Sequence, residues 1–548
     1  MEVENMERPI ILASDFDIER DVLDTDTGNA QRLKDEYGNE CRYCLQEKVW
    51  YVWSPKDGVW KKDPQDLLMQ IRAKITFQKL RNEQNARVRE QEANIETFRH
   101  KLTKKLECRA DESLTEDEQK NLRFYQSALS LLDWYTTSEN ADRLKKAIEM
   151  LRSEPGMAVN TWQWDADPYL FNCKSGTFDL RESTIVREHR REDFCTMIAP
   201  VEYQLFADES ERPLFEAFIR RIMPDEEKRK YLQRFFGLCL SGLADERAIL
   251  LFLGSGMNGK GTLIRLLCSV LGEEGGYAAM AAMNSFLQAK SLSADETRND
   301  LVALIGKRFV AASESSKKSP PLNSALLKSF AGGDGSLRIR GNWESLRNFL
   351  PKGKLILATN NEPKIDDDSD GMWSRIKKIW FDVQIPEAEQ DKDLVAKIMA
   401  SESCAVLAWF LEGWAAYWED RQAGRPGLPT PTSIMEDTET YRDGQSQVAA
   451  FIEACYRIVP LSHGRAESLS NGIKSTDLYT TYKNWVERVG ERDRKSHKVV
   501  SLELEKWGQR HGVTVARRSD GMYWFGLQPL DADPPNDDDK LVFDAESV

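Results

Sequence analysis

One stretch decides the fold: Ile249-Leu-Leu-Phe-Leu-Gly-Ser-Gly-Met-Asn-Gly-Lys-Gly-Thr262, followed by an apolar run with helical spacing that ends at Leu271. A phosphate-binding loop needs glycines, so that backbone N–H groups can surround phosphate oxygens, and a lysine that reaches the outer phosphates. The preceding apolar run predicts a strand, and the following run predicts a helix whose N-terminus favours negative charge. We therefore predict an α/β nucleotide-binding core. Its nucleotide contacts are Gly254, Gly256, Asn258, Gly259, Lys260, Gly261 and Thr262.

The loop departs from the general pattern at one position. The usual motif ends Gly-Lys-Ser/Thr, and its hydroxyl coordinates Mg²⁺. Here Gly261 stands at that position and the hydroxyl follows on Thr262. We expect Thr262 to supply the Mg²⁺ ligand, while the sequence leaves open which group replaces the missing hydroxyl at Gly261.

Three further strand-like runs carry polar residues where a nucleotide hydrolase uses them. Glu314 follows the run 308–312 and is the candidate hydrolytic base and second Mg²⁺ ligand, against the alternative of a surface glutamate. Asn360 follows the run 355–359, and an amide there can bond both the attacking water and the γ-phosphate. Arg375 precedes the run 378–383; it either neutralises charge in a neighbouring subunit's site or makes a surface ion pair.

The segment 325–344 predicts a DNA-binding hairpin. Alternation in Leu337-Arg-Ile-Arg340 places both arginines on one face of a strand, and the turn signal Gly341-Asn342 precedes Trp343. Cations attract phosphates and aromatic rings stack on bases, so Arg338, Arg340 and Trp343 are candidate contacts with single-stranded DNA. The alternative is a solvated hairpin with a packed tryptophan.

The ordered set of motifs resembles superfamily-3 helicases, and specifically the phage/plasmid and poxvirus primase-helicase family. The resemblance is carried by the loop 254–260, Ala-Ser-Glu at 312–314, Lys328-Ser-Phe-Ala-Gly-Gly-Asp334, Ala-Thr-Asn-Asn-Glu-Pro at 358–363 and Trp-Ser-Arg-Ile at 373–376. Asp26-Thr-Gly-Asn-Ala30, a Trp-rich hairpin at 47–60 and Ser175-Gly-Thr-Phe-Asp-Leu180 look like the domain that precedes the motor. The resemblance covers about residues 25–525. Related helicases often carry two adjacent acids where this chain has Ser313 and Glu314.

What the resemblance implies is an AAA+-type motor that works as a homo-hexamer with ATP and Mg²⁺. Asn360 would be the sensor and Arg375 the finger supplied in trans. The hairpin would enter the pore of the ring and grip one DNA strand, Lys328 would couple the motor to DNA, and the polarity would be 3′ to 5′.

The fold class expected is a multidomain α/β protein, with a mostly helical or mixed region before the AAA+-type core and a winged-helix-like module after it. The predicted parts are a flexible leader (1–25), a mostly helical domain with the Trp-rich hairpin (26–155), a mixed α/β and helical collar (156–242), the motor (243–422), a linker (423–447), the winged-helix-like module (448–530) and an acidic disordered tail (531–548). Charges on the helical patterns of 64–152 are either solvated faces or a binding surface.

Composition limits the remaining possibilities. The net charge is −14, so contact with nucleic acid has to be local. No run reaches the roughly 20 apolar residues that span a bilayer, and the N-terminus is acidic, which predicts a cytoplasmic protein, in a bacterial host, with no membrane partner. The nine scattered cysteines suit reduced thiols. Cys41 and Cys44 alone have ligand spacing, and they are either a zinc pair or ordinary strand-edge thiols.

Together these features predict an ATP-dependent DNA helicase for replication of a phage, plasmid or satellite element. The N-terminal region lacks an evident carboxylate set for priming, and the five histidines are isolated, so neither primase nor nicking activity is expected. A separate primase, polymerase or initiator is a possible partner of the C-terminal module. Two alternatives stay open: an AAA+ ATPase that remodels nucleoprotein, for example in defence, without net unwinding, and an origin-binding initiator.

Overall fold

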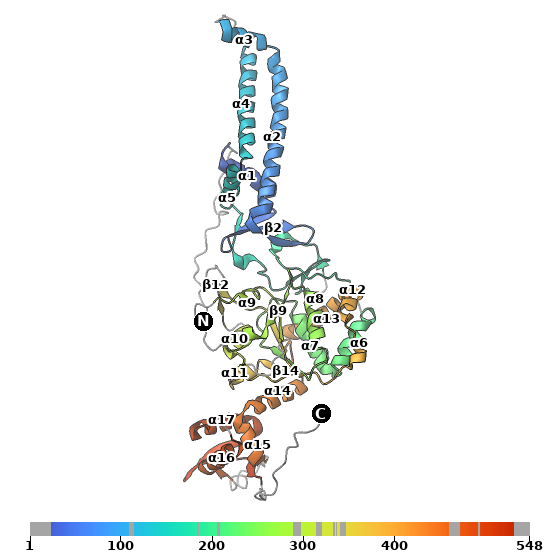
Figure 1. Ribbon diagram of the computed structural model, residues 1–548, viewed down its shortest axis with the longest axis vertical. Coiled ribbons are helices and arrows are strands. Elements are labelled where there is room, and N and C mark those ends of the chain that lie inside the picture. Colours follow the sequence, from blue (N-terminus) through green and yellow to red (C-terminus); the bar gives the residue numbers. More distant parts are fainter. Residues whose placement is uncertain are drawn as a thin grey trace.

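The computed structural model describes residues 24–108, 114–182, 186–204, 209–288, 297–313, 320–332, 335, 337–339, 347–459, 472–490 and 494–530. Figure 1 shows a helical stalk at one end, a central layer built around a sheet, and a small domain at the other end. The fold is therefore a multidomain mixture of helices and sheets with a helical N-terminal region, as expected. The predicted leader and acidic tail lie almost wholly outside the described residues.

A four-stranded sheet forms the base of the N-terminal region. Helix α1 (Asp26–Tyr37) precedes strands β1 (Cys41–Cys44), β2 (Val49–Ser54) and β3 (Val59–Asp63), and β4 (Ala158–Val159) completes the order β3-β2-β1-β4. Antiparallel pairing of β2 with β3 confirms the Trp-rich hairpin. Cys41 and Cys44 are both buried, but they pack in different clusters, Cys41 beside Trp50 and Cys44 beside Trp53. Burial raises the pKa of the Cys41 thiol to about 12, and the two cysteines belong to separate hydrophobic clusters.

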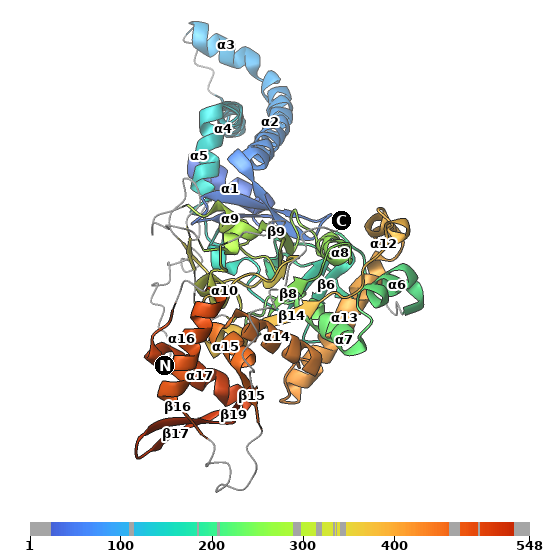
Figure 2. The ribbon, with the colours of Figure 1, turned by 60° about the horizontal axis from the view of Figure 1, so that its bottom comes forward.

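The stalk consists of two long helices that lie side by side (Figures 1 and 2). Its elements are α2 (Leu67–Glu96), α3 (Arg99–Cys108) and α4 (Glu116–Ser138), and α5 (Ala141–Leu151) returns to the base. The prediction that 64–152 is largely helical is confirmed for its described residues. At its root, the buried carboxylate of Asp63 accepts the backbone N–H groups of Leu68 at 2.9 Å and Met69 at 3.0 Å. These bonds satisfy donors that the first turn of α2 would otherwise leave unpaired.

A smaller mixed region connects the stalk to the central sheet. Strands β5 (Leu170–Cys173) and β6 (Gly176–Asp179) form a hairpin, with β7 (Val186–Arg187) beside it. Helices α6 (Pro213–Ile222) and α7 (Glu226–Leu238) follow. Short 3-10 helices occupy Pro64–Asp66, Thr161–Gln163, Arg191–Asp193, Glu209–Glu211, Met283–Phe286 and Glu387–Glu389.

The central sheet is parallel and has the order β14-β8-β13-β10-β9. Its strands are β8 (Ile249–Leu253), β9 (Ala278–Ala282), β10 (Phe309–Ser313), β13 (Lys354–Ala358) and β14 (Ile376–Trp380). Alternate residues of β8 enter two different hydrophobic clusters, so the sheet is covered on both faces. Four of these strands were predicted, although β14 begins two residues before the expected Lys378; β9 was not predicted.

Further elements surround this sheet. Helices α8 (Lys260–Leu271), α9 (Asn299–Val302), α10 (Ser324–Phe330) and α11 (Asp370–Trp373) connect its strands, and β11 (Leu337–Ile339) pairs with β12 (Arg347–Phe349) in a separate hairpin. Helices α12 (Leu394–Ser401) and α13 (Ser403–Gln422) follow, and α13 packs along α7. Among the described helices none alone is long and apolar enough to cross a membrane; α12 and its preceding turn pass that test only jointly with α13, across an 81° bend.

Two buried cations connect the N-terminal ends of the sheet strands with the preceding mixed region. Arg308 donates to the carbonyl oxygens of Leu170 and Leu240. Lys354 donates to the carbonyls of Ser241 at 3.0 Å and Leu243 at 2.6 Å, and burial lowers the pKa of its amine to about 8. Because these acceptors are backbone oxygens of the mixed region, the two regions meet in a fixed arrangement.

The segment 423–447, predicted as a linker, contains an ordered helix in its second half. Helix α14 (Thr432–Gln445) packs on β14, and its Ile434 and Tyr441 are buried in the two clusters that cover the sheet. The connecting run is therefore shorter than expected, because a largely polar helix needs only a few apolar anchors to dock.

The C-terminal domain has its own hydrophobic core. Its helices are α15 (Gln447–Cys455), α16 (Ser475–Val489) and α17 (His497–His511). Strands β17 (Thr514–Arg518) and β18 (Gly521–Phe525) form a hairpin, and β16 (Ile473–Lys474) pairs with β18. Strand β15 (Tyr456–Ile458) pairs with β19 (Leu527–Pro529). Figure 2 shows this domain below the sheet layer.

Candidate functional site

The loop between β8 and α8 has the backbone that the glycine pattern predicts. Gly254, Gly256 and Gly259 have φ angles of 157°, 102° and 82°. A Cβ on Gly254 would lie 2.1 Å from the Asn258 side-chain nitrogen, and one on Gly259 would lie 2.5 Å from Ile222. Larger residues at these two positions would therefore meet both an unfavourable backbone conformation and a clash.

Lys260 is the first residue of α8, and only 6% of it is exposed. Its amine donates to the Gly254 carbonyl at 2.9 Å, the Asn258 side-chain oxygen at 2.9 Å and the Asn360 side-chain oxygen at 3.2 Å. Burial lowers the pKa of this amine to about 8. All three acceptors are neutral oxygens, so none of them neutralises the positive charge of the amine. The negative charge of a phosphate would do so.

The sheet order brings Asn360 to this loop. Strand β13 lies directly beside β8, so the residues that follow both strands meet at one edge. The side chain of Asn360 is exposed there, yet its oxygen reaches Lys260, a hundred positions away in the sequence. Asn258 also ties the loop to the segment after β14, since its amide nitrogen lies 3.5 Å from the Phe381 carbonyl.

The Mg²⁺ ligands expected from the sequence are only partly described. Thr262 is half-buried in the first turn of α8, and its hydroxyl accepts a 3.5 Å hydrogen bond from Arg265. A Cβ at Gly261 would meet no described atom within 4 Å, so crowding does not explain the missing hydroxyl. Glu314 lies outside the described residues; Ser313, the last residue of β10, is exposed and paired in register with Ala358 of β13. The available donors are oxygens, which Mg²⁺ prefers.

Lys328, on α10, contacts the chain that follows Asn360. Its amine donates to the Asp367 carboxylate at 2.6 Å and to the Ser369 hydroxyl at 3.0 Å. Burial alone would raise the pKa of Asp367, but these hydrogen bonds outweigh it and lower that pKa below its ordinary value. The amine therefore joins α10 to the loop that begins at the nucleotide edge.

The expected DNA hairpin is described only at its base. Arg338 is exposed on β11 between Leu337 and Ile339, which point toward the core, and it pairs in register with Asn348 of β12. Arg340 and Trp343 lie outside the described residues. The alternation predicted for this strand is thus confirmed at Arg338.

Arg375 lies where the strands of the sheet begin, whereas Lys260 lies where they end. It precedes β14, whose first residue Ile376 is in register with Ile249, the first residue of β8. Only 4% of the residue is exposed, and its guanidinium donates to the carbonyls of Ala331 (2.8 Å) and Gly371. Arg375 is thus enclosed within its own chain, and the role of a finger for a neighbouring subunit stays a prediction.

Sequence reasoning missed the helix that packs against the loop after Asn360. On α14, Tyr441 donates to the Pro363 carbonyl, and Arg442 pairs with Asp368 at 2.9 Å and Asp370 at 2.8 Å. No motif marks these residues, because their role depends on which surface α14 covers. The loop that follows the candidate sensor is consequently held by both α10 and α14.

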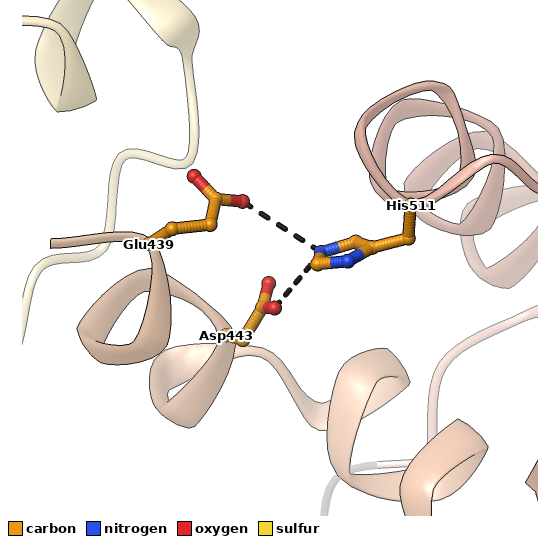
Figure 3. Close-up of side chains that lie close together, drawn as sticks. All are labelled: Glu439, Asp443 and His511. Carbon is orange, nitrogen blue, oxygen red and sulfur yellow. Dashed lines mark ion pairs between the residues drawn. The ribbon is translucent and has the colours of Figure 1, made fainter. Parts of the chain in front are cut away.

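Helix α14 also contacts the C-terminal domain. Figure 3 shows the imidazole of His511 facing the carboxylates of Glu439 and Asp443, with His511–Asp443 at 2.9 Å and His511–Glu439 at 3.7 Å. Their ligand atoms lie within 4.8 Å of one another, which is close enough for a metal ion. However, Arg510 already pairs with both carboxylates. The cluster is therefore an ion-pair network that joins α17 to α14.

Two family models match this chain, one over the N-terminal and mixed regions and one over the central sheet. A family model described as "D5 N terminal like" matches residues 30–224, and one described as "Family of unknown function (DUF5906)" matches residues 252–375. "Putative helicase L207/L206" of Acanthamoeba polyphaga mimivirus is 28% identical over 342 residues, which cover 59% of this chain and 33% of that protein. "Putative primase C962R" of African swine fever virus (isolate Warthog/Namibia/Wart80/1980) is 25% identical over 280 residues, covering 49% and 28%.

The chain spans about a third of the length of these curated relatives. Among solved structures, "The A form apo structure of NrS-1 C terminal region-CTR" has a TM-score of 0.41 at 12% identity, covering 93% of this chain and 99% of that one. The two domain matches, in this order, together with relatives named as viral helicases and primases, place the chain in the D5-like primase-helicase family.

Proposed function

We infer that this chain is the ATP-hydrolysing motor of a DNA helicase of superfamily 3, with an AAA+-type core and a winged-helix-like C-terminal domain. The observation that carries this proposal is the contact of Lys260 with Asn360, which joins the glycine loop to the end of the adjacent strand. The strand order β14-β8-β13-β10-β9 supports the AAA+ assignment. The motor would act as a homo-hexamer moving 3′ to 5′, in the bacterial cytoplasm, during replication of a phage, plasmid or satellite element.

The chemistry follows from the residues around Lys260. Backbone N–H groups of the loop and the Lys260 amine would hold the outer phosphates, exchanging neutral oxygens for charged ones. Asn360 would then orient the attacking water, with Glu314 taking its proton. Thr262 and Glu314 would hold Mg²⁺, which neutralises charge on the phosphates when bound.

Coupling to DNA is proposed to run through Lys328. Loss of the γ-phosphate would release Asn360 and shift the loop 361–370, which Lys328 grips through Asp367 and Ser369. Lys328 lies on α10, which leads into the β11–β12 hairpin carrying Arg338, so a shift of the loop reaches the hairpin. With Arg340 and Trp343, that hairpin would bind phosphates and stack on bases of one strand.

The finger role of Arg375 needs a rearrangement. Its guanidinium is bonded to carbonyls of its own chain. Those bonds would have to break on ring assembly before Arg375 could reach a neighbouring nucleotide. Burial therefore weighs against Arg375 as the trans-acting group.

Strand displacement on a forked DNA with a 3′ tail tests the proposal. Wild type should unwind the fork with ATP, Lys260→Ala should lose both ATPase activity and unwinding, and Lys392→Ala, at an exposed lysine that has no part in the proposed mechanism, should retain both. Normal ATPase activity without displacement would favour the nucleoprotein-remodelling alternative. ATP-independent duplex binding that is lost on truncation after Ser446, which spares α14, would favour the origin-binding alternative.

A further inference from the structure

A cavity of about 240 Å³ lies between α11, the start of β14 and α14. Its lining includes Trp373, Lys377, Met435 and the charged residues Asp370, Glu439 and Arg442. This volume is below the roughly 300–1,000 Å³ of pockets that enclose whole ligands. The cavity therefore suits a small group rather than a complete nucleotide.

Two hydrogen-bond donors in this lining have no acceptor among the described residues. The indole N–H of Trp373 is buried and unpaired, although its ring packs against Tyr441. The amine of Lys377 makes no hydrogen bond or ion pair with the described part of the chain, and burial lowers its pKa. A buried donor without a partner is costly, and the Trp373 indole N–H is such a donor. Because it lies beside the same cavity as the unpartnered cation of Lys377, the pair points to an acceptor that arrives from outside.

The acidic residues of the lining do not fill that role. Asp370 pairs with Arg442 at 2.8 Å, and Glu439 pairs with Arg510 of the C-terminal domain. Each carboxylate is thus already neutralised by a guanidinium. Lys377 is the cation of this lining whose charge is left without a partner among the described residues.

A nucleotide on the same chain's loop cannot supply the acceptor. Lys377 is in register with Leu250 of β8, whereas the glycine loop begins after Leu253. Three residues of strand separate these levels, which is about 10 Å before the loop itself is counted. The acceptor must come from solution or from another molecule.

We propose that this cavity binds an oxyanion, a phosphate or a carboxylate, through the amine of Lys377 and the indole N–H of Trp373. Phosphate would reach it as a free solute, and a carboxylate would be presented by a second copy of this chain. Either group offers several acceptor oxygens and a charge opposite to that of Lys377.

The test uses 5-fluorotryptophan-labelled full-length protein carrying Lys260→Ala, so that nucleotide-loop binding and failure of the proposed ATPase leave the result unaffected. The Trp373 signal is assigned by Trp373→Phe and followed by fluorine NMR. One arm titrates inorganic phosphate at low protein concentration. The other raises the protein concentration without added anion, with the mass followed by sedimentation velocity.

Each outcome decides the matter. A saturable shift with phosphate, weakened at least about tenfold by Lys377→Gln, supports a phosphate site. A shift that accompanies self-association and disappears in Lys377→Gln supports a carboxylate from a second copy. Lys377→Arg should keep either response, and Lys392→Gln, at an exposed lysine outside the cavity, is the matched surface control. An unchanged Trp373 signal in both arms, or an equal response in folded Lys377→Gln, overturns the proposal.

Discussion

The pH dependence of nucleotide binding should report the burial of Lys260. In the free protein, burial lowers the pKa of its amine to about 8, whereas a bound phosphate would hold the amine protonated well above that value. Binding at higher pH therefore has to take up a proton. The dissociation constant for ATP should be nearly constant below pH 8 and rise about tenfold for each pH unit above it, so that pH 9 is roughly tenfold weaker than pH 7.

Isothermal titration calorimetry with a non-hydrolysable ATP analogue, from pH 7 to 9.5, measures this directly. The buffers should differ in ionisation enthalpy, so that the proton uptake predicted above pH 8 is counted independently of affinity. Lys260→Arg is the matched control, because guanidinium stays charged over the whole range and reports any titration of the nucleotide itself. A flat wild-type profile, or the same slope in Lys260→Arg, would refute the reasoning.

Three other substitutions test separate parts of the structure. Gly254→Ala should abolish nucleotide binding while circular dichroism stays native, because its Cβ would lie 2.1 Å from the Asn258 side chain; normal binding would show that the loop relaxes. Lys328→Ala should leave basal ATP hydrolysis within about twofold but remove its stimulation by single-stranded DNA, since the bonds to Asp367 and Ser369 are lost; unchanged stimulation contradicts the coupling route. Glu402→Ala should cost about 2 kcal/mol in urea unfolding, because the buried carboxylate accepts the backbone N–H groups of Leu214 and Phe215 at the start of α6; an unchanged midpoint would rule out this cap.

What the sequence could predict was set by local pattern. The glycine spacing and the apolar runs located the loop and four strands, and parallel pairing then brought Asn360 to Lys260. Strand β9 escaped because Ala278-Ala-Met-Ala-Ala282 has none of the β-branched or aromatic residues that mark a strand.

Burial and docking could not be predicted, because they depend on distant parts of the chain. Arg375 donates to the backbone carbonyls of residues 331 and 371, among its contacts, and such acceptors carry no sequence signature. The sequence predicts a linker where α14 lies, because Ile434 and Tyr441 are too few apolar residues to indicate a docked helix unless the sheet that they cover is known. The cavity beside Lys377 could not be predicted either, because its lining comes from segments that are distant in the sequence.

The stalk makes the N-terminal region a lever arm. Helix α2 has 30 residues and is therefore about 45 Å long, and its root is fixed by Asp63 at the end of β3. A tilt of roughly 5° in the small sheet at its base would displace the far end of α2 by about 4 Å. A small tilt near the motor would thus be amplified into a displacement of several ångströms at the tip of the stalk.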